Sequence, residues 1–272
     1  MASVRAIDTC ALIPRATLDG IGTIMTVEAS APDTCAAELD STEIGKKTRL
    51  TWSLSTSRDP LGPSSGTTET KIGDATVHTE RDAQPAPDSK IRTCTAWTRF
   101  PATVGLFVHV SAPIAAQPCA AHDAALPGAL ELLRTEPPVG TSPDTPKTPV
   151  AVANPCAVLT QLDISTPLDK QFLHGCMFEY KGTIVDLQYA YDNTALVARG
   201  KPILVVNDHP GYDLGSTTET AWYAAILGDP LTPAGPTNSA LGPRVPVVNL
   251  MGRDPAVLRE VLGHTAELFP SA

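Results

Sequence analysis

An even set of six cysteines constrains this chain more than any other feature of its sequence. No C-x-x-C pair is present and no histidine stands at zinc-finger spacing, so disulfides explain the set better than a metal does. Disulfides are rare where glutathione keeps thiols reduced. We therefore expect an oxidising, extracytoplasmic compartment; buried, reduced thiols in a cytosolic protein are the alternative. The cysteines are Cys10, Cys35, Cys94, Cys119, Cys156 and Cys176.

Two parts of the chain match in residue character, which predicts a tandem duplication. Residues 8–13 correspond to residues 154–159 around a cysteine, and the string Thr-Ala-Trp at 95–97 recurs at 220–222. Apolar and polar residues alternate at 48–54 and at 185–191, as in half-buried strands. Six cysteines allow about 15 pairings in principle, and the duplication favours Cys10–Cys35, Cys94–Cys119 and Cys156–Cys176. Each bridge would close a loop of about 20 to 25 residues and contribute about 3 kcal/mol.

Composition and helix signals indicate the fold class. With 26 prolines and 18% charged residues, the chain suits sheets and loops better than long helices. A closing helix is predicted in the second copy, where Asp254 can cap it, Pro255 suits its first position and an apolar stripe follows. Its counterpart over Ala120–Leu133 contains Pro127 and Gly128, which allows two short pieces in place of one helix. These signals predict an α+β fold of two tandem units, each a mostly antiparallel sheet packed by one or two helices.

A proline-rich segment separates the two units. Five of the fourteen residues from Glu136 to Pro149 are proline, a composition typical of an extended, semi-rigid linker. We therefore expect a first α+β unit at 1–135, a linker at 136–150 and a second α+β unit at 151–272.

The charge balance argues against some partners. A formal net charge of −9 argues against nucleic acid, because phosphate binding requires clustered Lys and Arg. No stretch approaches the roughly 18 apolar residues of a membrane span, and the start of the chain lacks the basic and apolar regions of a signal peptide. We expect that a targeting segment has been trimmed, so that a membrane would be reached only through a missing transmembrane or lipid anchor.

Two segments offer candidate chemistry. Gly62–Gly66 fits the pattern G-x-S-x-G, but its flanks are loop-like where a nucleophile elbow needs a strand and a helix, so a turn is the better interpretation. Asp208, His209 and Asp213 follow an apolar strand and form the best polar cluster, suited in principle to a metal or general-base role. The same residues are also ordinary turn chemistry. The sequence thus predicts no catalytic residue, no metal ligand and no cofactor, with Asp208, His209 and Asp213 as a possible polar site.

Two tryptophans are predicted to pack in the core. Trp97 and Trp222 fall at equivalent positions of the two copies, in a chain with 5% aromatic residues. That equivalence predicts core packing in preference to ligand stacking.

The cysteine placement carries a family resemblance. The string Pro155–Thr160, a second cysteine some twenty residues on, alternating strands and a closing helix resemble small secreted actinobacterial lipoproteins of uncharacterised function. They also resemble the extracellular sensor domains of mycobacterial transmembrane Ser/Thr kinases. The resemblance covers the second unit, and the first more loosely because Asp8 and Thr9 replace the usual proline before the cysteine. It implies a compact antiparallel sheet with helices against it, used outside the cytoplasm for binding, sensing or assembly.

These observations together define the expected function. We expect an extracytoplasmic, non-catalytic binding or sensor module, the ectodomain of a membrane-anchored or lipid-anchored actinobacterial protein. Its ligand would be an unidentified protein or small molecule, bound in the groove between the units. A secreted hydrolase with a site near Asp208 and His209, or a cell-envelope assembly scaffold, are the alternatives.

Overall fold

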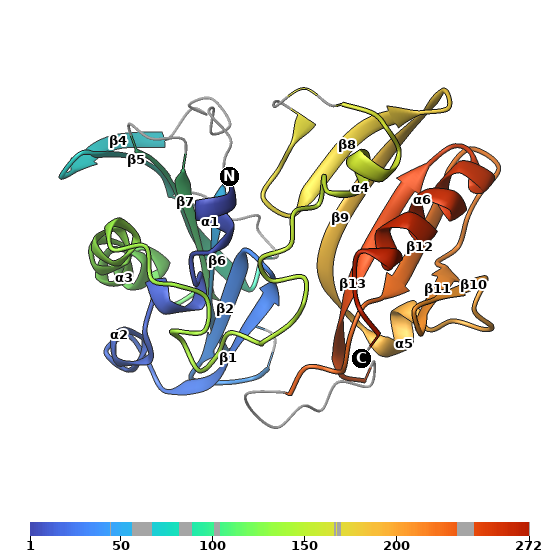
Figure 1. Cartoon of the computed structure of the whole chain (residues 1–272). Helices are drawn as coiled ribbons and strands as arrows, with labels where there is room; N and C mark the ends of the chain where they lie inside the picture. The colour runs from blue at the N-terminus through green and yellow to red at the C-terminus, as the bar shows by residue number, and fades with distance from the viewer. Residues whose placement is uncertain are drawn as a thin grey trace. The chain divides into compact units, whose positions relative to one another are not determined.

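A computed structural model describes residues 1–43, 45–55, 67–81, 89–100, 104–165, 167, 170–232 and 242–271. The chain divides into two compact units, which comprise essentially Ser3–Thr145 and Pro146–Ala272. The described residues form an α+β protein with two mostly antiparallel sheets and few helices (Figure 1). The fold class predicted from the sequence is confirmed at this level.

The first unit is a seven-stranded antiparallel sheet in the order β1-β2-β3-β7-β6-β5-β4. Its strands are β1 (Ile24–Ala31), β2 (Thr34–Leu39), β3 (Thr48–Ser55), β4 (Thr67–Ile72), β5 (Ala75–Arg81), β6 (Ile91–Arg99) and β7 (Gly105–Pro113). Its helical elements are α1 (Ala2–Arg5), the 3-10 helix η1 (Cys10–Leu12), α2 (Arg15–Asp19) and α3 (Pro118–Arg134).

Helix α3 and the 3-10 helix η1 pack on one face of this sheet, which we call the inner face. A disulfide joins Cys94 of β6 to Cys119 at the start of α3, and Cys94 is fully buried. The inner face of β3 carries the buried Leu50, Trp52 and Leu54, the alternation predicted from the sequence. Side chains at the intervening positions point to the opposite side, the outer face.

Helix α3 runs unbroken from Pro118 to Arg134, with Pro127 inside it. A proline within a helix removes a hydrogen bond and costs about 3 kcal/mol. This cost is offset by burial, because one side of the helix packs against β6 and β7. The buried residues around the proline are Ala125, Leu126, Ala129, Leu130 and Leu133. The prediction that two short pieces could replace this helix is therefore wrong.

The second unit is a six-stranded antiparallel sheet in the order β10-β11-β12-β13-β9-β8. Its strands are β8 (Gly175–Tyr180), β9 (Thr183–Asn193), β10 (Leu204–Val206), β11 (His209–Asp213), β12 (Ala221–Ile226) and β13 (Arg244–Gly252). Its helices are α4 (Val158–Gln161), α5 (Thr194–Val197) and α6 (Pro255–Glu267).

The closing helix α6 forms as predicted and packs along β12 and β13 (Figure 1). Asp254 caps it by accepting hydrogen bonds from the backbone N–H groups of Ala256 and Val257. Pro255 occupies the first turn, where its missing N–H has no partner to lose. Its buried stripe includes Val257, Leu258, Val261 and Leu262.

Three disulfides tie the segments before or after each sheet to its strands. They join Cys10 to Cys35, Cys94 to Cys119 and Cys156 to Cys176, the same pairs that the sequence repeat predicts. Three such bonds are consistent with an oxidising, extracytoplasmic environment. Among the described residues, no helix is long and apolar enough to span a bilayer.

Candidate functional site

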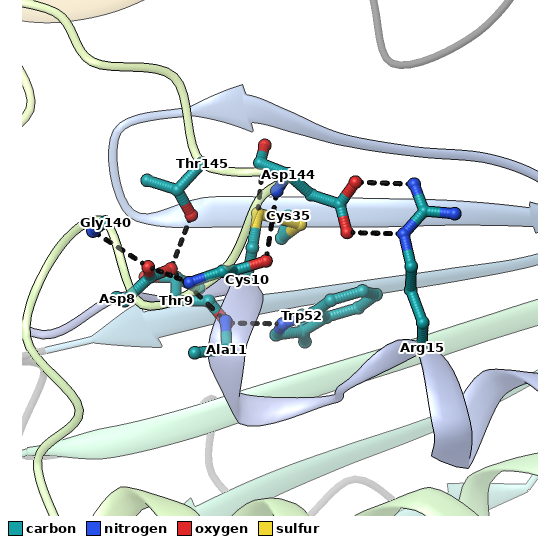
Figure 2. The surroundings of a disulfide bond; sticks show 11 residues. Asp8, Thr9, Cys10, Ala11, Arg15, Cys35, Trp52, Gly140, Asp144 and Thr145 are labelled. Atoms are coloured by element: carbon teal, nitrogen blue, oxygen red, sulfur yellow. Dashed lines mark hydrogen bonds and ion pairs between the residues drawn. A yellow bond between two sulfur atoms is a disulfide. The ribbon is translucent and has the colours of Figure 1, made fainter.

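The surroundings of the first disulfide contain a fully buried carboxylate, Asp8 (Figure 2). Its Oδ1 accepts hydrogen bonds from the Ala11 N–H, at 3.2 Å, and from the Thr145 hydroxyl. Its Oδ2 accepts from the backbone N–H groups of Gly140, at 3.0 Å, and Ser142, at 2.8 Å. A buried carboxylate is costly unless it is hydrogen-bonded, and here four donors satisfy Asp8.

Three of these donors belong to the segment expected to be a linker. An ion pair adds to the attachment: Arg15 donates from Nε and Nη2 to the two carboxylate oxygens of Asp144, at 3.0 and 2.6 Å (Figure 2). A backbone hydrogen bond also attaches this segment, because the Asp8 N–H donates to the Pro137 carbonyl at 2.7 Å. Residues 137–145, which we call the strap, are therefore folded onto their own unit. The cluster around Asp8 is structural, since its carboxylates are paired with donors of the strap and of the first unit; the buried Thr9 hydroxyl has no partner among the described residues.

The polar cluster predicted at Asp208, His209 and Asp213 is divided between separate contacts. Asn207 and Asp208 have φ of 49° and 64° and form the two-residue loop between β10 and β11, as in a type I′ hairpin. The buried His209 has its Nε2 3.2 Å from the Pro270 carbonyl oxygen, which holds the segment after α6. These contacts agree with the alternative interpretation from the sequence, in which these residues form a turn.

Asp213 is engaged in a turn of its own. One carboxylate oxygen accepts from the N–H groups of Gly215 and Ser216 and from the Ser216 hydroxyl. Partial burial alone would raise the pKa of Asp213, but these hydrogen bonds hold it below its ordinary value. Among the described residues, no group of three or more His, Cys, Asp or Glu is placed to hold a metal ion. Gly62–Gly66 lies outside the described residues.

A more distinctive surface lies on the outer face of the first sheet. The register places His78, Trp97, Phe107 and Ser53 in one row across β5, β6, β7 and β3. The next row contains Thr95, His109 and Thr51 on β6, β7 and β3. All of these side chains are half-buried. We call the surface made of His78, Trp97, Phe107 and His109 with Thr51, Ser53 and Thr95 the aromatic face.

The rings of the aromatic face lie against one another. Trp97 and Phe107 have ring centroids 5.8 Å apart at an interplanar angle of 55°. Phe107 and His109 are parallel, with centroids 6.4 Å apart. The His109 Nδ1 lies 2.9 Å from the Thr95 hydroxyl oxygen, within hydrogen-bond distance. The rings thus form a short line of aromatic groups bordered by threonine and serine hydroxyls.

The electrostatics favour a neutral imidazole at His109. Burial lowers the pKa of His109 below its ordinary value, and the positive charge of Arg49 on β3 lowers it further. Arg49 is itself paired with Glu38, which also binds Lys47. His78 lies 3.9 Å from the Glu69 carboxylate. The exposed Glu80 lies opposite Thr95. Charged groups of both signs therefore border the rings.

None of the described helical elements that contact this sheet covers the aromatic face. α3 is tied to the inner face through Cys94, η1 through Cys35, and α2 contacts both α3 and β1. The corresponding face of the second sheet differs, because Val197 of α5 packs there over a small buried cluster. That cluster contains Tyr212, Ala224, Val245 and Val247.

The predicted burial of Trp97 and Trp222 in the core is wrong. Both lie on outer faces, and Trp222 is 42% exposed. The two tryptophans also differ in register. In the first sheet, the row that contains Cys35 meets β6 at Ala96, one residue before Trp97. In the second sheet, the row that contains Cys176 meets β12 at Tyr223, one residue after Trp222. Trp52 is the one of the three tryptophans that is buried, and its indole N–H donates to the Thr9 carbonyl at 2.7 Å.

Comparison with known proteins gives no family. No family model and no curated protein matches the chain. Among solved structures, DynU16, a protein of the dynemicin biosynthetic locus, aligns over 96% of this chain and 91% of its own length. The identity is 10% and the TM-score is 0.15, so this match carries no argument about fold or ligand.

Proposed function

We propose that this chain is an extracytoplasmic, non-catalytic binding module whose ligand contacts the aromatic face. The observation that carries the proposal is that Trp97, Phe107 and His109 stand together on a sheet face that no described helix of their unit covers. A sheet gains stability by burying apolar side chains against another layer. Large aromatic side chains left on the other side are typical of a contact surface, because they supply much contact area with few rotatable bonds.

A duplicated architecture is part of the proposal. Starting from the strand that carries the second cysteine of each unit, the strand orders are β2-β3-β7-β6-β5-β4 and β8-β9-β13-β12-β11-β10. Both sheets are followed by a closing helix, and in both a disulfide joins a segment before the sheet to the second residue of that first strand. The same order of equivalent elements supports two copies of one unit. The added strand β1 of the first copy and α5 of the second are the differences.

The location and the chemistry of the module follow from separate observations. The disulfides support an extracytoplasmic location, and we propose a membrane-anchored or lipid-anchored ectodomain on the family resemblance. The contacts of His209 and Asp213 account for both residues by turns and by attachment of the C-terminal segment, which favours a binding role over the hydrolase alternative.

Retention of cell-envelope fractions tests the proposal. The full chain is immobilised and exposed to separate polysaccharide, lipid and protein fractions of an actinobacterial envelope, beside Trp97→Ala and Phe107→Ala variants. We expect one fraction to be retained by the parent chain and lost from both variants. Trp222→Ala serves as a matched control, since it removes an exposed indole from the other unit. If no fraction is retained in a way that depends on Trp97 and Phe107, the aromatic face is not a binding surface.

A further inference from the structure

The chemistry of the aromatic face restricts the class of ligand. The surface combines aromatic rings with the hydroxyl side chains of Thr51, Ser53 and Thr95. A lipid or a hydrophobic protein partner would need Leu, Ile and Val side chains at these positions. It is a sheet face and not an edge, so its backbone groups are already paired within the ladder. An added peptide strand is therefore not the occupant that this surface favours.

The charged side chains around the aromatic face restrict the class of ligand further. Glu38 is held between Lys47 and Arg49, and Glu69 lies beside His78. Glu80 lies opposite Thr95, and Arg99 lies on the same side of β6 as Trp97. Charges of both signs therefore border the surface, which carries no dense cluster of one sign to attract a phosphate or a polyanion. A neutral ligand matches such a surface better than a charged one.

Hydrogen bonding defines the ligand further. His109 shares its Nδ1 with Thr95, and its Nε2 has no hydrogen bond among the described residues. A neutral imidazole and neighbouring hydroxyls can each both donate and accept. A ligand that also donates and accepts from the same atoms, as alcohol groups do, satisfies both roles of these side chains.

Geometry suits a repeating polymer of such groups. Strands lie about 4.8 Å apart and residues on one face about 7 Å apart along each strand, so the rows present groups at the scale of one sugar ring. Aromatic rings pack against the C–H faces of sugars, while the hydroxyls at the sugar's edge bond to polar side chains beside the rings.

We infer that the aromatic face binds a neutral polysaccharide, with Trp97 and Phe107 packing against sugar rings and His109, Thr51 and Thr95 bonding to sugar hydroxyls. This inference rests on the proposed binding function and names its ligand class.

Affinity electrophoresis of the full chain in gels that contain defined polysaccharides tests the inference. Neutral probes are α-glucan, β-glucan, mannan, galactan and xylan, and charged probes are polygalacturonate and heparin. We expect retardation by at least one neutral probe, unchanged by added salt because no ion pair is involved. Trp97→Ala should weaken it about tenfold or more, and His109→Gln by a smaller factor. Trp222→Ala should leave it unchanged, and circular dichroism checks that each variant is folded.

The outcomes separate the ligand class from the binding function. Retardation by none of the neutral probes, binding of charged probes alone, or a neutral probe bound equally by Trp97→Ala overturns the inference. If the envelope experiment shows retention of a lipid or protein fraction that depends on Trp97, the binding function stands and the polysaccharide class falls. If no fraction depends on Trp97, both fall.

Discussion

Replacing Asp8 by asparagine tests whether one buried carboxylate attaches the strap to the first unit. The substitution keeps the size of the side chain but leaves one acceptor oxygen in place of two. If that oxygen serves Ala11 and Thr145, the new amide group faces the N–H groups of Gly140 and Ser142, which are donors as well. Two part-buried donors then lose their acceptor.

The magnitude follows from the number of donors that are lost. Each buried donor without an acceptor costs about 1–3 kcal/mol. Both bonds are only part-buried, so each lost acceptor should cost about 1–2 kcal/mol, in the lower part of that range, and Asp8→Asn should lower the free energy of unfolding by about 2–4 kcal/mol.

Urea unfolding in a Trp222→Phe background provides the assay, because the remaining indoles, Trp52 and Trp97, both report on the first unit. Hydrogen exchange at Gly140 and Ser142 should lose protection in the same variant. Asp74→Asn is the matched control: this exposed carboxylate pairs with Arg134, and its loss should barely move the unfolding midpoint. An Asp8→Asn protein with wild-type unfolding and unchanged exchange at both amides would refute the role assigned to Asp8.

Three further predictions concern other parts of the fold. The pKa of His109 in the folded protein lies below its unfolded value of about 6.5. The contribution of His109 to stability is therefore present above that pH and is lost as the pH falls toward the folded pKa. His109→Gln should flatten this pH dependence in thermal unfolding between about pH 7 and 5, and an unchanged slope would contradict the prediction. Asp208→Gly should raise the free energy of unfolding by several tenths to about 1 kcal/mol in thermal melts, because φ of 64° favours glycine in a type I′ turn, and a lower melting temperature would show that the Asp208 side chain stabilises the loop. Replacing Cys94 and Cys119 together by alanine should cost about 3 kcal/mol in urea unfolding, whereas a loss below 1 kcal/mol would mean that the bridge adds little to the attachment of α3.

The sequence predicted those parts of the fold whose signals are local. Asp254, Pro255 and the apolar stripe that follows specify α6 within a few residues, and the structure contains that helix with its cap. The alternation at Leu50, Trp52 and Leu54 likewise identifies the inner face of β3. The cysteine pairs followed from a repeat and needed no knowledge of the fold.

Contacts between distant residues were beyond local signals. The strap depends on Asp8, which meets Gly140 and Ser142 more than a hundred residues later, and no periodicity links them. A run of prolines indicated only an extended chain and not what it lies against. Pro127 signalled a break in α3, but burial of the surrounding residues outweighed its cost.

The candidate site was missed because period-two alternation separates two faces without saying which one is buried. Trp97 was assigned to the core because its position matches that of Trp222 in the repeat, yet its neighbours Ala96 and Thr98 occupy the buried side of β6. His109 lies in the apolar sequence of β7, and the register with Thr95 and Thr51 places it in the row next to that of Trp97 and Phe107. Small residues at the buried positions of β6 are the signal that could have revealed the reversal.

The attachment of the strap also determines where this protein can be divided. Composition suggests a cut at the first prolines, after residue 135, but a fragment that ends there would keep Ala11 and lose Gly140, Ser142 and Thr145 as donors to Asp8. A buried charge would remain with one partner. The shortest first fragment that retains all the donors to Asp8 ends at Thr145. The second fragment then begins at Pro146. It keeps Thr148, whose hydroxyl oxygen lies 2.9 Å from that of Tyr191.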